Sequence, residues 1–358
     1  MSAGSSLDTD ISNEIVAEMV QLLQPSWSVE AVTRAANGTD FVASVDVQTP
    51  DGPITTVLKA TTADHVSSET ALAEPCILEF IGRETSIPVP TVFGYGDDHD
   101  EYPTPFYLMS HVEGENYEGR IRDLPKTARM EIFREAGQNL AELHTLGPLP
   151  KSGRIGVVDG ELAILDTDEF PSYESFHGRL LASYEDNLDS LASGGHFVDL
   201  ADDKTRFADL VPPLRQYLQE TIPELPTPES STYSHEDYRY GNLLVEPTTG
   251  RTQAVLDWGI FSSAPPAYNL ANTESLLLTP DVDSSERTNE LRQTLRRSYA
   301  ERRPEWSFDD ATLKQMEVYR LTCRIDAMAC LPLWHQDATP SERDERAAEH
   351  RDFVHQYL

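Results

Sequence analysis

The sequence is short of positive charge. Lysine occurs only at Lys59, Lys126, Lys151, Lys204 and Lys314. Lysine and arginine together number 28 against 61 aspartates and glutamates, which gives a formal net charge of −33. A surface so negative repels nucleic acid and anionic membranes, and we expect neither as a partner. This acid-rich, lysine-poor composition is typical of halophilic proteins in the cytoplasm of salt-accumulating organisms, where salt screens the repulsion between carboxylates.

Cysteine and long apolar segments are also scarce. The three cysteines form no Cys-x-x-Cys pair, and so few thiols suit a reducing compartment. Cys323 and Cys330 are expected on one helix, about two turns apart, which is too far for a disulfide. No apolar run reaches membrane-spanning length and no signal peptide opens the chain, so we expect a soluble, cytoplasmic protein. A hydrophobic content of 39% argues against disorder.

The amino-terminal part predicts one helix followed by antiparallel strands. Residues 1–25 contain a helix that Asp10 can cap and Pro25 ends. Its apolar positions follow helical spacing and are Ile11, Ile15, Met19, Leu22 and Leu23. Strands are expected at residues 29–33, 41–47 and 54–60, joined by turns of the Asn-Gly and Pro-Asp-Gly type. Together they form an antiparallel meander at the start of a small lobe.

The most informative stretch is Ser234-His-Glu-Asp-Tyr-Arg-Tyr-Gly-Asn, which precedes a predicted hairpin. Asp237 and Asn242 stand five residues apart in a polar loop. Short apolar runs at 243–245 and 254–256 flank the turn Pro247-Thr-Thr-Gly, so the hairpin brings Asn242 close to Asp257. Carboxylate and amide oxygens suit Mg²⁺, which shares its ligands with phosphates. Asp237 is then the base for an incoming hydroxyl, and the set fits phosphoryl transfer.

His-x-Asp-x-x-x-x-Asn followed by a hairpin and Asp-Trp-Gly resembles the catalytic and metal loops of the aminoglycoside phosphotransferase and choline-kinase-like small-molecule kinases. The resemblance implies an α+β, two-lobed protein-kinase-like fold. A small antiparallel β-sheet N-lobe would occupy residues 26–110, and a mostly helical C-lobe residues 111–358, with its catalytic and metal loops at 234–259. By the same resemblance Asp237 is catalytic, Asn242 and Asp257 bind the metal, and His235 shapes the loop.

The resemblance also implies a nucleotide site for ATP or another nucleoside triphosphate. Lys59 ends the third strand and matches the lysine that contacts the α- and β-phosphates. A lone lysine on a strand is otherwise a solvated edge residue, but lysine is scarce here. Gly38 and Thr39 match the turn over the phosphates, although a single glycine is also what an ordinary hairpin turn uses. Backbone groups near Ser110 and Val112 match the hinge that holds the adenine edge.

The family lysine pairs with a glutamate on the following helix. Glu74 matches by its offset from Pro88-Val-Pro. Pro75 fits the first position of a helix and biases Glu74 away from helical geometry, so Glu69 or Glu79 remains an alternative.

The carboxy-terminal part reads as helical. Helices are expected at residues 126–146, 173–193, 204–221, 284–302, 309–331 and 341–357, and Pro212-Pro213 should kink or split the third of these. His144 is interpreted as a hydrogen-bonded packing residue, because no metal-ligand spacing surrounds it.

The sequence therefore predicts a Mg²⁺- and ATP-dependent phosphotransferase that acts on a hydroxyl of a small molecule. Two departures from the family pattern are Glu236, where a glycine is usual, and Asn269, where an aspartate is usual. Glu236 would strain the loop if that position needs positive φ, and it adds negative charge. Asn269 would loosen support of the Asp257 loop. A nucleotide-binding regulatory module without catalysis is the alternative, and a metal-dependent hydrolase is a third class.

Overall fold

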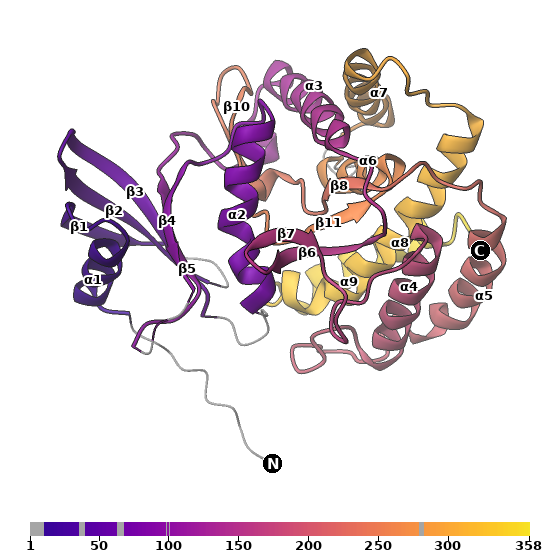
Figure 1. Cartoon of the computed structure of the whole chain (residues 1–358). Helices are drawn as coiled ribbons and strands as arrows, with labels where there is room; N and C mark the ends of the chain where they lie inside the picture. The colour runs from indigo at the N-terminus through magenta and orange to yellow at the C-terminus, as the bar shows by residue number, and fades with distance from the viewer. Residues whose placement is uncertain (1–10, 36–39, 63–67, 98, 100, 279–282) are drawn as a thin grey trace. The chain divides into compact units, whose positions relative to one another are not determined.

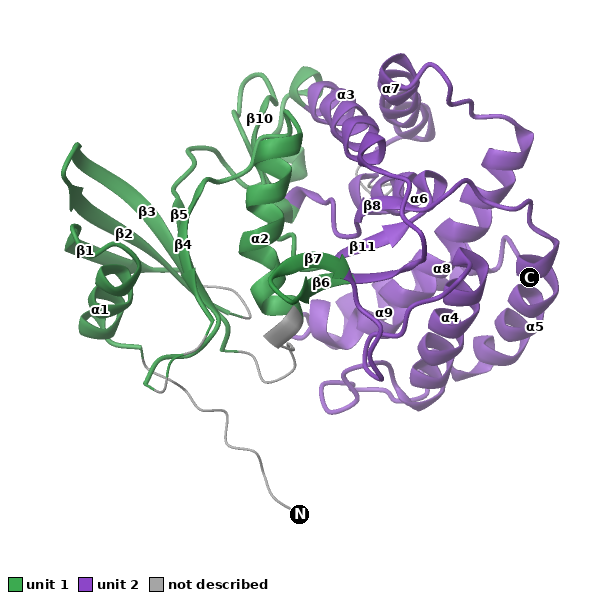
Figure 2. Ribbon diagram, in the orientation of Figure 1, with its two compact units in different colours: residues 1–128, 155–163, 241–260 green, residues 129–154, 164–240, 261–358 purple. Residues whose placement is uncertain are grey.

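The computed structural model describes residues 11–35, 40–62, 68–97, 99, 101–278 and 283–358. The chain divides into two compact units, coloured green and purple in Figure 2. The first unit comprises residues 1–128, 155–163 and 241–260, and the second comprises 129–154, 164–240 and 261–358. The chain therefore leaves and re-enters each unit.

A five-stranded antiparallel sheet is the centre of the first unit. Its spatial order is β1-β2-β3-β5-β4 (Figure 1). The strands are β1 (Ser28–Arg34), β2 (Phe41–Thr49), β3 (Gly52–Ala60), β4 (Val92–Gly96) and β5 (Phe106–Ser110). The three predicted strands and their meander are confirmed. β5 inserts between β3 and β4, a pairing of segments far apart in sequence that local patterns do not reveal.

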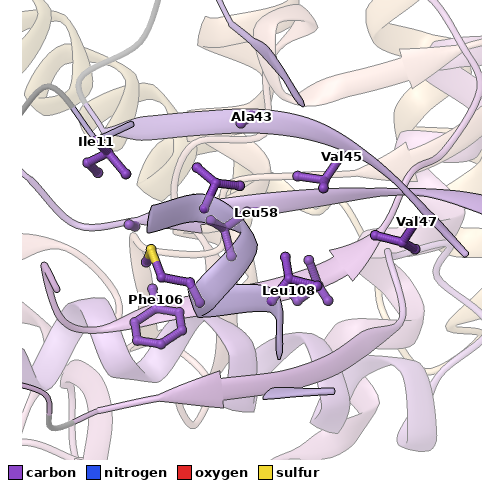
Figure 3. Packing of buried hydrophobic residues seen from close by; sticks show 11 residues of the cluster. Ile11, Ala43, Val45, Val47, Leu58, Phe106 and Leu108 are labelled. Carbon is purple, nitrogen blue, oxygen red and sulfur yellow. The ribbon is translucent and has the colours of Figure 1, made fainter. Parts of the chain in front are cut away.

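Helix α1 (Asn13–Leu23) covers one face of this sheet, and four of the five predicted apolar positions, Ile11, Ile15, Met19 and Leu23, pack into the cluster between them. Its buried residues are Val16, Met19 and Val20, whereas the side chain of Leu22 is exposed. Leu22 also fits the helical spacing of the apolar positions, and only contact with the sheet decides that its side chain faces solvent. Figure 3 shows the resulting cluster, in which α1 packs on the inward side chains of β2, β3 and β5. Ser12 caps the helix, and Asp10 lies outside the described residues.

Two further elements complete the first unit. Helix α2 (Ser68–Glu84) follows β3. Strands β9 (Leu243–Val245) and β10 (Thr252–Val255) form the predicted hairpin, with Leu243 opposite Val255. Gly250 in the turn has φ +77°, and a Cβ there would lie 2.0 Å from the carbonyl oxygen of Ala128. A residue with a side chain would therefore be both strained and obstructed at this position.

The second unit is built mainly of helices (Figure 1). They are α3 (Lys126–Leu143), whose first turn belongs to the other unit, α4 (Phe176–Ser193), α5 (Val211–Thr221), α6 (Pro266–Leu277), α7 (Ser285–Arg302), α8 (Asp310–Trp334) and α9 (Pro340–Val354). Strand β11 (Phe261–Ala264) pairs with β8 (Thr232–His235) and with the first residues of β6 (Gly153–Val158), which a short hairpin joins to β7 (Glu161–Ile164). The antiparallel sheet and the helical carboxy-terminal part confirm the predicted fold class.

Prolines account for the two main errors in the predicted helices. The helix expected at 204–221 starts only at Val211, because Pro212 and Pro213 occupy its first turn, where no N–H partner is needed. Pro75, expected at the start of a helix, instead lies inside α2.

The three cysteines carry free thiols, and Cys323 and Cys330 share helix α8 as predicted. Among the described residues, no helix combines the length and the apolar character that crossing a bilayer requires.

Candidate active site

Lys59 near the end of β3 sits among three carboxylates of the first unit. Its Nζ lies 2.7 Å from Glu74 Oε2, 3.8 Å from Asp257 Oδ1 and 3.7 Å from Asp40 Oδ2. Among the considered glutamates whose side chains the structure describes, Glu74 on α2 contacts the lysine. Lys59 is therefore no solvated edge residue, because its side chain is only 17% exposed.

Burial and charge act in opposite directions on this ammonium group. Burial alone would lower the pKa of Lys59, but the negative charges of Glu74 and Asp257 outweigh it and hold the pKa well above its ordinary value. The amine is consequently a permanent cation at neutral pH. Such a fixed charge is suited to an anionic ligand such as a phosphate chain.

The hairpin β9–β10 brings Asn242 beside the segment that carries Asp257. The N–H of Leu256 donates to the carbonyl oxygen of Asn242 at 2.8 Å. Asp257 adopts φ +57°, a left-handed conformation that is rare for residues other than glycine and that is concentrated at functional sites. Trp258 anchors the turn, since it is buried and its Nε1–H donates to the carbonyl of Val255 at 3.0 Å. The Asp257 carboxylate remains 46% exposed.

The remaining predicted nucleotide contacts are only partly described. Gly38 and Thr39 lie outside the described residues. Ser110 is the last residue of β5, where its N–H donates to the carbonyl of Thr91 at 2.8 Å and its hydroxyl accepts from the Thr91 N–H at 2.9 Å. The N–H of Ser110 is therefore already engaged and is not free for a nucleotide base. Val112 follows two residues later, just beyond the strand.

Asp237 lies in the second unit, in the loop that follows β8. Its backbone N–H donates to Nδ1 of the fully buried His235 at 3.1 Å, which accords with a loop-shaping role for this histidine. The Nε of Arg239 lies 3.1 Å from both carboxylate oxygens of Asp237. The carboxylate, 20% exposed, is thus held in a defined orientation.

Glu236 neither strains this loop nor adds an uncompensated charge. Among the described residues other than glycine, positive φ occurs at Asp159 and Asp257, so Glu236 adopts an ordinary conformation. Arg179 of α4 donates to both Glu236 oxygens at 2.9 and 3.1 Å, and the hydroxyl of Ser262 donates to one of them. The positive charge of the Arg179 guanidinium therefore compensates the negative charge of Glu236, which stands where the family usually has a glycine.

Asn269, expected from sequence to bear on the Asp257 loop, supports the loop that carries Asp237. It is fully buried on α6, and its Nδ2 donates to the carbonyl of His235 at 2.8 Å. Its Oδ1 lies 3.0 Å from Nε2 of His144, whose Nδ1 lies 2.8 Å from the hydroxyl of Tyr299. An amide supplies the donor that the carbonyl needs, which an aspartate could not.

His144 is the predicted packing residue. Burial lowers its pKa to about 3, so the ring is neutral, with one donor and one acceptor for its two partners.

Three residues of this arrangement were missed by sequence reasoning. Asp40 follows the predicted phosphate turn, Arg239 lies two residues after Asp237, and Arg179 is 57 residues away from Glu236. Asp40 and Arg239 lie close to recognised positions, so proximity in sequence could have suggested them. Arg179 carries no local signal, because nothing in α4 indicates which loop its side chain reaches.

Each unit holds its own set of polar groups. The first provides a fixed ammonium with oxygen donors of the amide and carboxylate type, which suit Mg²⁺ by their chemistry. The second provides an oriented carboxylate that can accept a hydrogen bond and a proton.

The family model described as "Phosphotransferase enzyme family" matches residues 32–307. Curated relatives include acyl-CoA dehydrogenase family member 10 from Mus musculus, 23% identical over 186 residues, and family member 11 from Gallus gallus, 24% identical over 195 residues. These matches cover 52% and 54% of this chain but only 15% and 21% of the relatives. The chain therefore corresponds to a minor part of their length.

Solved structures of similar fold include a thermostable variant of aminoglycoside phosphotransferase APH(4)-Ia in complex with ADP and hygromycin B. It has 15% identity and a TM-score of 0.60, over 95% of this chain and 98% of that one. A variant of aminoglycoside 2′-phosphotransferase-IIIa in complex with GDP has 14% identity and a TM-score of 0.61, over 96% and 98%. These likenesses show a kinase-like fold. Since the family model covers well over half of the 358 residues, the chain belongs to the phosphotransferase enzyme family.

Proposed function

We propose that this protein transfers the terminal phosphoryl group of ATP, or of another nucleoside triphosphate, to a hydroxyl of a small molecule in a Mg²⁺-dependent reaction. The observation that carries the proposal is the ammonium of Lys59, held by Glu74 at 2.7 Å and by Asp257 at 3.8 Å. Lys59 is the cation for the α- and β-phosphates. The ADP and GDP complexes of the similar structures support a nucleotide as the ligand.

The metal would be held by Asn242 and Asp257. Both offer hard oxygen donors, and the exposed, left-handed Asp257 turn presents its carboxylate outward. When bound, Mg²⁺ neutralises charge on the phosphate oxygens. Val112 and the carbonyl of Ser110 are the candidate backbone contacts for the base, and Gly38 and Thr39 for the phosphates.

Asp237 orients the acceptor hydroxyl and accepts its proton as the phosphoryl group moves in line. His235 and Arg239 hold its backbone and carboxylate, so little reorientation is needed at the moment of reaction. Positioning of this kind can lower a barrier by roughly 7–11 kcal/mol. The compensated Glu236 and the well-placed Asn269 favour an active enzyme over a regulatory module that no longer catalyses.

The decisive variant is Asp237→Asn. We expect phosphoryl transfer to fall by roughly 10²–10⁴-fold, because the amide cannot accept the proton, while the Kd for ATP stays within about threefold. Transfer is measured with radiolabelled ATP and Mg²⁺ at high KCl, against a panel of hydroxylated metabolites with and without amino groups. Asp352→Asn, an exposed change on α9, is the matched control.

Wild-type transfer by Asp237→Asn would refute the assignment. ATP binding without turnover in the unmodified protein would favour the regulatory module. Phosphate release that needs no acceptor would favour a hydrolase.

A further inference from the structure

Three side chains with different ligand atoms lie close together in the second unit, and none of them has been given a role above. They are His196, Asp326 and Cys330, and their Nε2, carboxylate oxygen and Sγ all lie within 4.8 Å of one another. The Nε2 of His196 is 4.0 Å from Oδ1 of Asp326. Among the described residues, no other group of three histidine, cysteine or acidic side chains gathers this closely, despite 61 acidic residues in the chain.

Helix α8 fixes two of these side chains. Asp326 and Cys330 are four residues apart, so they project from the same face, one turn from each other. The helix lies against α4, and the chain just beyond the end of α4 provides His196 (Figure 1).

The backbone fixes the third side chain against the same helix. His196 follows the Gly194-Gly195 end of α4, and its N–H donates to the carbonyl of Ala329 at 2.9 Å. Gly195 has φ +97°, and a Cβ there would lie 2.4 Å from that carbonyl oxygen. Only glycine permits this close approach, so the loop presents His196 to Asp326 and Cys330 in a fixed position.

Asn187 of α4 completes the set. It is 9% exposed, its Oδ1 lies 3.0 Å from Nε2 of His196, and its Nδ2 lies 3.4 Å from Oδ1 of Asp326. It can serve as a fourth, neutral oxygen ligand, or it can orient Asp326 while the other three residues bind.

The donors match a borderline-soft cation. Imidazole and thiolate favour Zn²⁺, whereas Mg²⁺ prefers oxygen alone. Bond lengths of about 2.0–2.3 Å around a tetrahedral Zn²⁺ place its ligand atoms about 3.3–3.8 Å apart. The present spacing of up to 4.8 Å therefore needs to contract by about 1.5 Å at most, which rotamer adjustment can supply.

We propose that His196, Asp326 and Cys330, with Asn187, form a binding site for a divalent cation of the Zn²⁺ class. This site is distinct in residues and in ligand chemistry from the proposed Mg²⁺ ligands Asn242 and Asp257. It does not depend on the proposed phosphotransferase activity, and it should bind metal without nucleotide.

Cobalt(II) tests the site because a cobalt–thiolate bond gives a near-ultraviolet charge-transfer band. The full-length protein, stripped with EDTA and kept in excess Mg²⁺, is titrated with Co²⁺. We expect the band to saturate at one equivalent and to vanish when one equivalent of Zn²⁺ is added. Cys330→Ser should abolish it, and His196→Gln should weaken cobalt binding roughly tenfold or more. Cys323→Ser, on the same helix but outside the cluster, should leave it unchanged.

A second measurement uses only the unmodified protein and so does not depend on folding of a variant. Zn²⁺ should slow alkylation of Cys330 by iodoacetamide, read by peptide mass mapping, and leave alkylation of Cys76 unchanged. Three results would each overturn the proposal. The first is cobalt binding without a thiolate band, and the second is a band that survives in Cys330→Ser. The third is equal alkylation of Cys330 with and without Zn²⁺.

Discussion

Charged side chains beside the candidate site are held by partners of opposite charge. Glu236 and Arg179 illustrate this, with side chains that are 12% and 19% exposed. Removing one member of a buried pair leaves the other charge uncompensated, which costs about 3–5 kcal/mol in a fully buried setting. The family position that usually holds glycine is thus occupied here by a carboxylate that depends on an arginine of α4.

We predict that Glu236→Gln lowers the free energy of unfolding by about 2–3 kcal/mol, somewhat below the fully buried value because the pair keeps some contact with water. Chemical denaturation followed by circular dichroism measures the change. In the double variant Glu236→Gln/Arg179→Met, the free energy of unfolding should fall by less than the sum of the falls in the two single variants, because neither charge is then left alone.

The control for this prediction is Glu349→Gln, which removes an exposed partner of Arg346. Their side chains are 49% and 42% exposed, so a loss below about 0.5 kcal/mol is expected. If Glu236→Gln lowers the free energy of unfolding no more than Glu349→Gln does, the Glu236–Arg179 pair does not stabilise the loop that carries Asp237.

Helices α3 and α7 approach each other closely at Gly137. A Cβ at this position would lie 2.2 Å from Oγ of Ser298 and 2.3 Å from the carbonyl oxygen of Leu295. Alanine gains about 1 kcal/mol over glycine in a helix, but overlap with a backbone carbonyl cannot be relieved by a rotamer and costs about 1–3 kcal/mol or more. We therefore predict that Gly137→Ala destabilises the protein by about 1–2 kcal/mol, measured by urea denaturation.

At Gly82 in α2, by contrast with Gly137, there is room for a Cβ. The nearest atom to a Cβ there is Cγ2 of Val89 at 3.4 Å, an ordinary contact. Gly82→Ala should consequently stabilise the protein by about 0.5–1 kcal/mol. Stabilisation by both substitutions would show that α3 and α7 are not packed as described.

Ion pairs between helices also hold α6, α7 and α8 together, and no local sequence pattern indicates these pairs. Glu274 of α6 is fully buried and binds Arg296 at 2.6 Å, with Arg292 and Arg320 each at 3.3 Å. These arginines come from α7 and α8. Helices α7 and α8 were predicted from the sequence, but α6 and the buried glutamate that joins it to them were not, because a sequence shows a charge without its partners.

The net charge of −33 acts on the whole molecule. Repulsion between carboxylates weakens compact states, and the Debye length falls from about 10 Å at 0.1 M salt to about 3 Å at 1 M. We predict that Tm rises on the order of 5–10 °C when KCl increases from 0.1 to 2 M, since each 1 kcal/mol corresponds to roughly 2–4 °C for units of this size. Differential scanning calorimetry measures it.

Sucrose of equal osmolality is the control, because it is excluded from protein surfaces without screening charge. An equal rise of Tm in sucrose and in KCl, or no rise in KCl, would contradict an electrostatic origin.

Much of the architecture follows from local sequence. Alternation and turn residues predict the first strands and the β9–β10 hairpin, because backbone conformation there depends on neighbouring residues. The order of the five-stranded sheet does not follow, since β5 pairs with β3 across an intervening helix and strand. Pro75 was also misjudged, because it lies inside α2 and not at its start.

The sequence by itself determined the family motif, the hairpin that brings Asn242 to Asp257, and the acidic character of the surface. Each of these depends on spacing along the chain or on composition. Only the tertiary structure decided that Glu74 is the partner of Lys59 and that Arg179 neutralises Glu236. It alone also gathers His196 with Asp326 and Cys330. Pairings between distant residues are set by how elements pack, and packing depends on the whole chain at once.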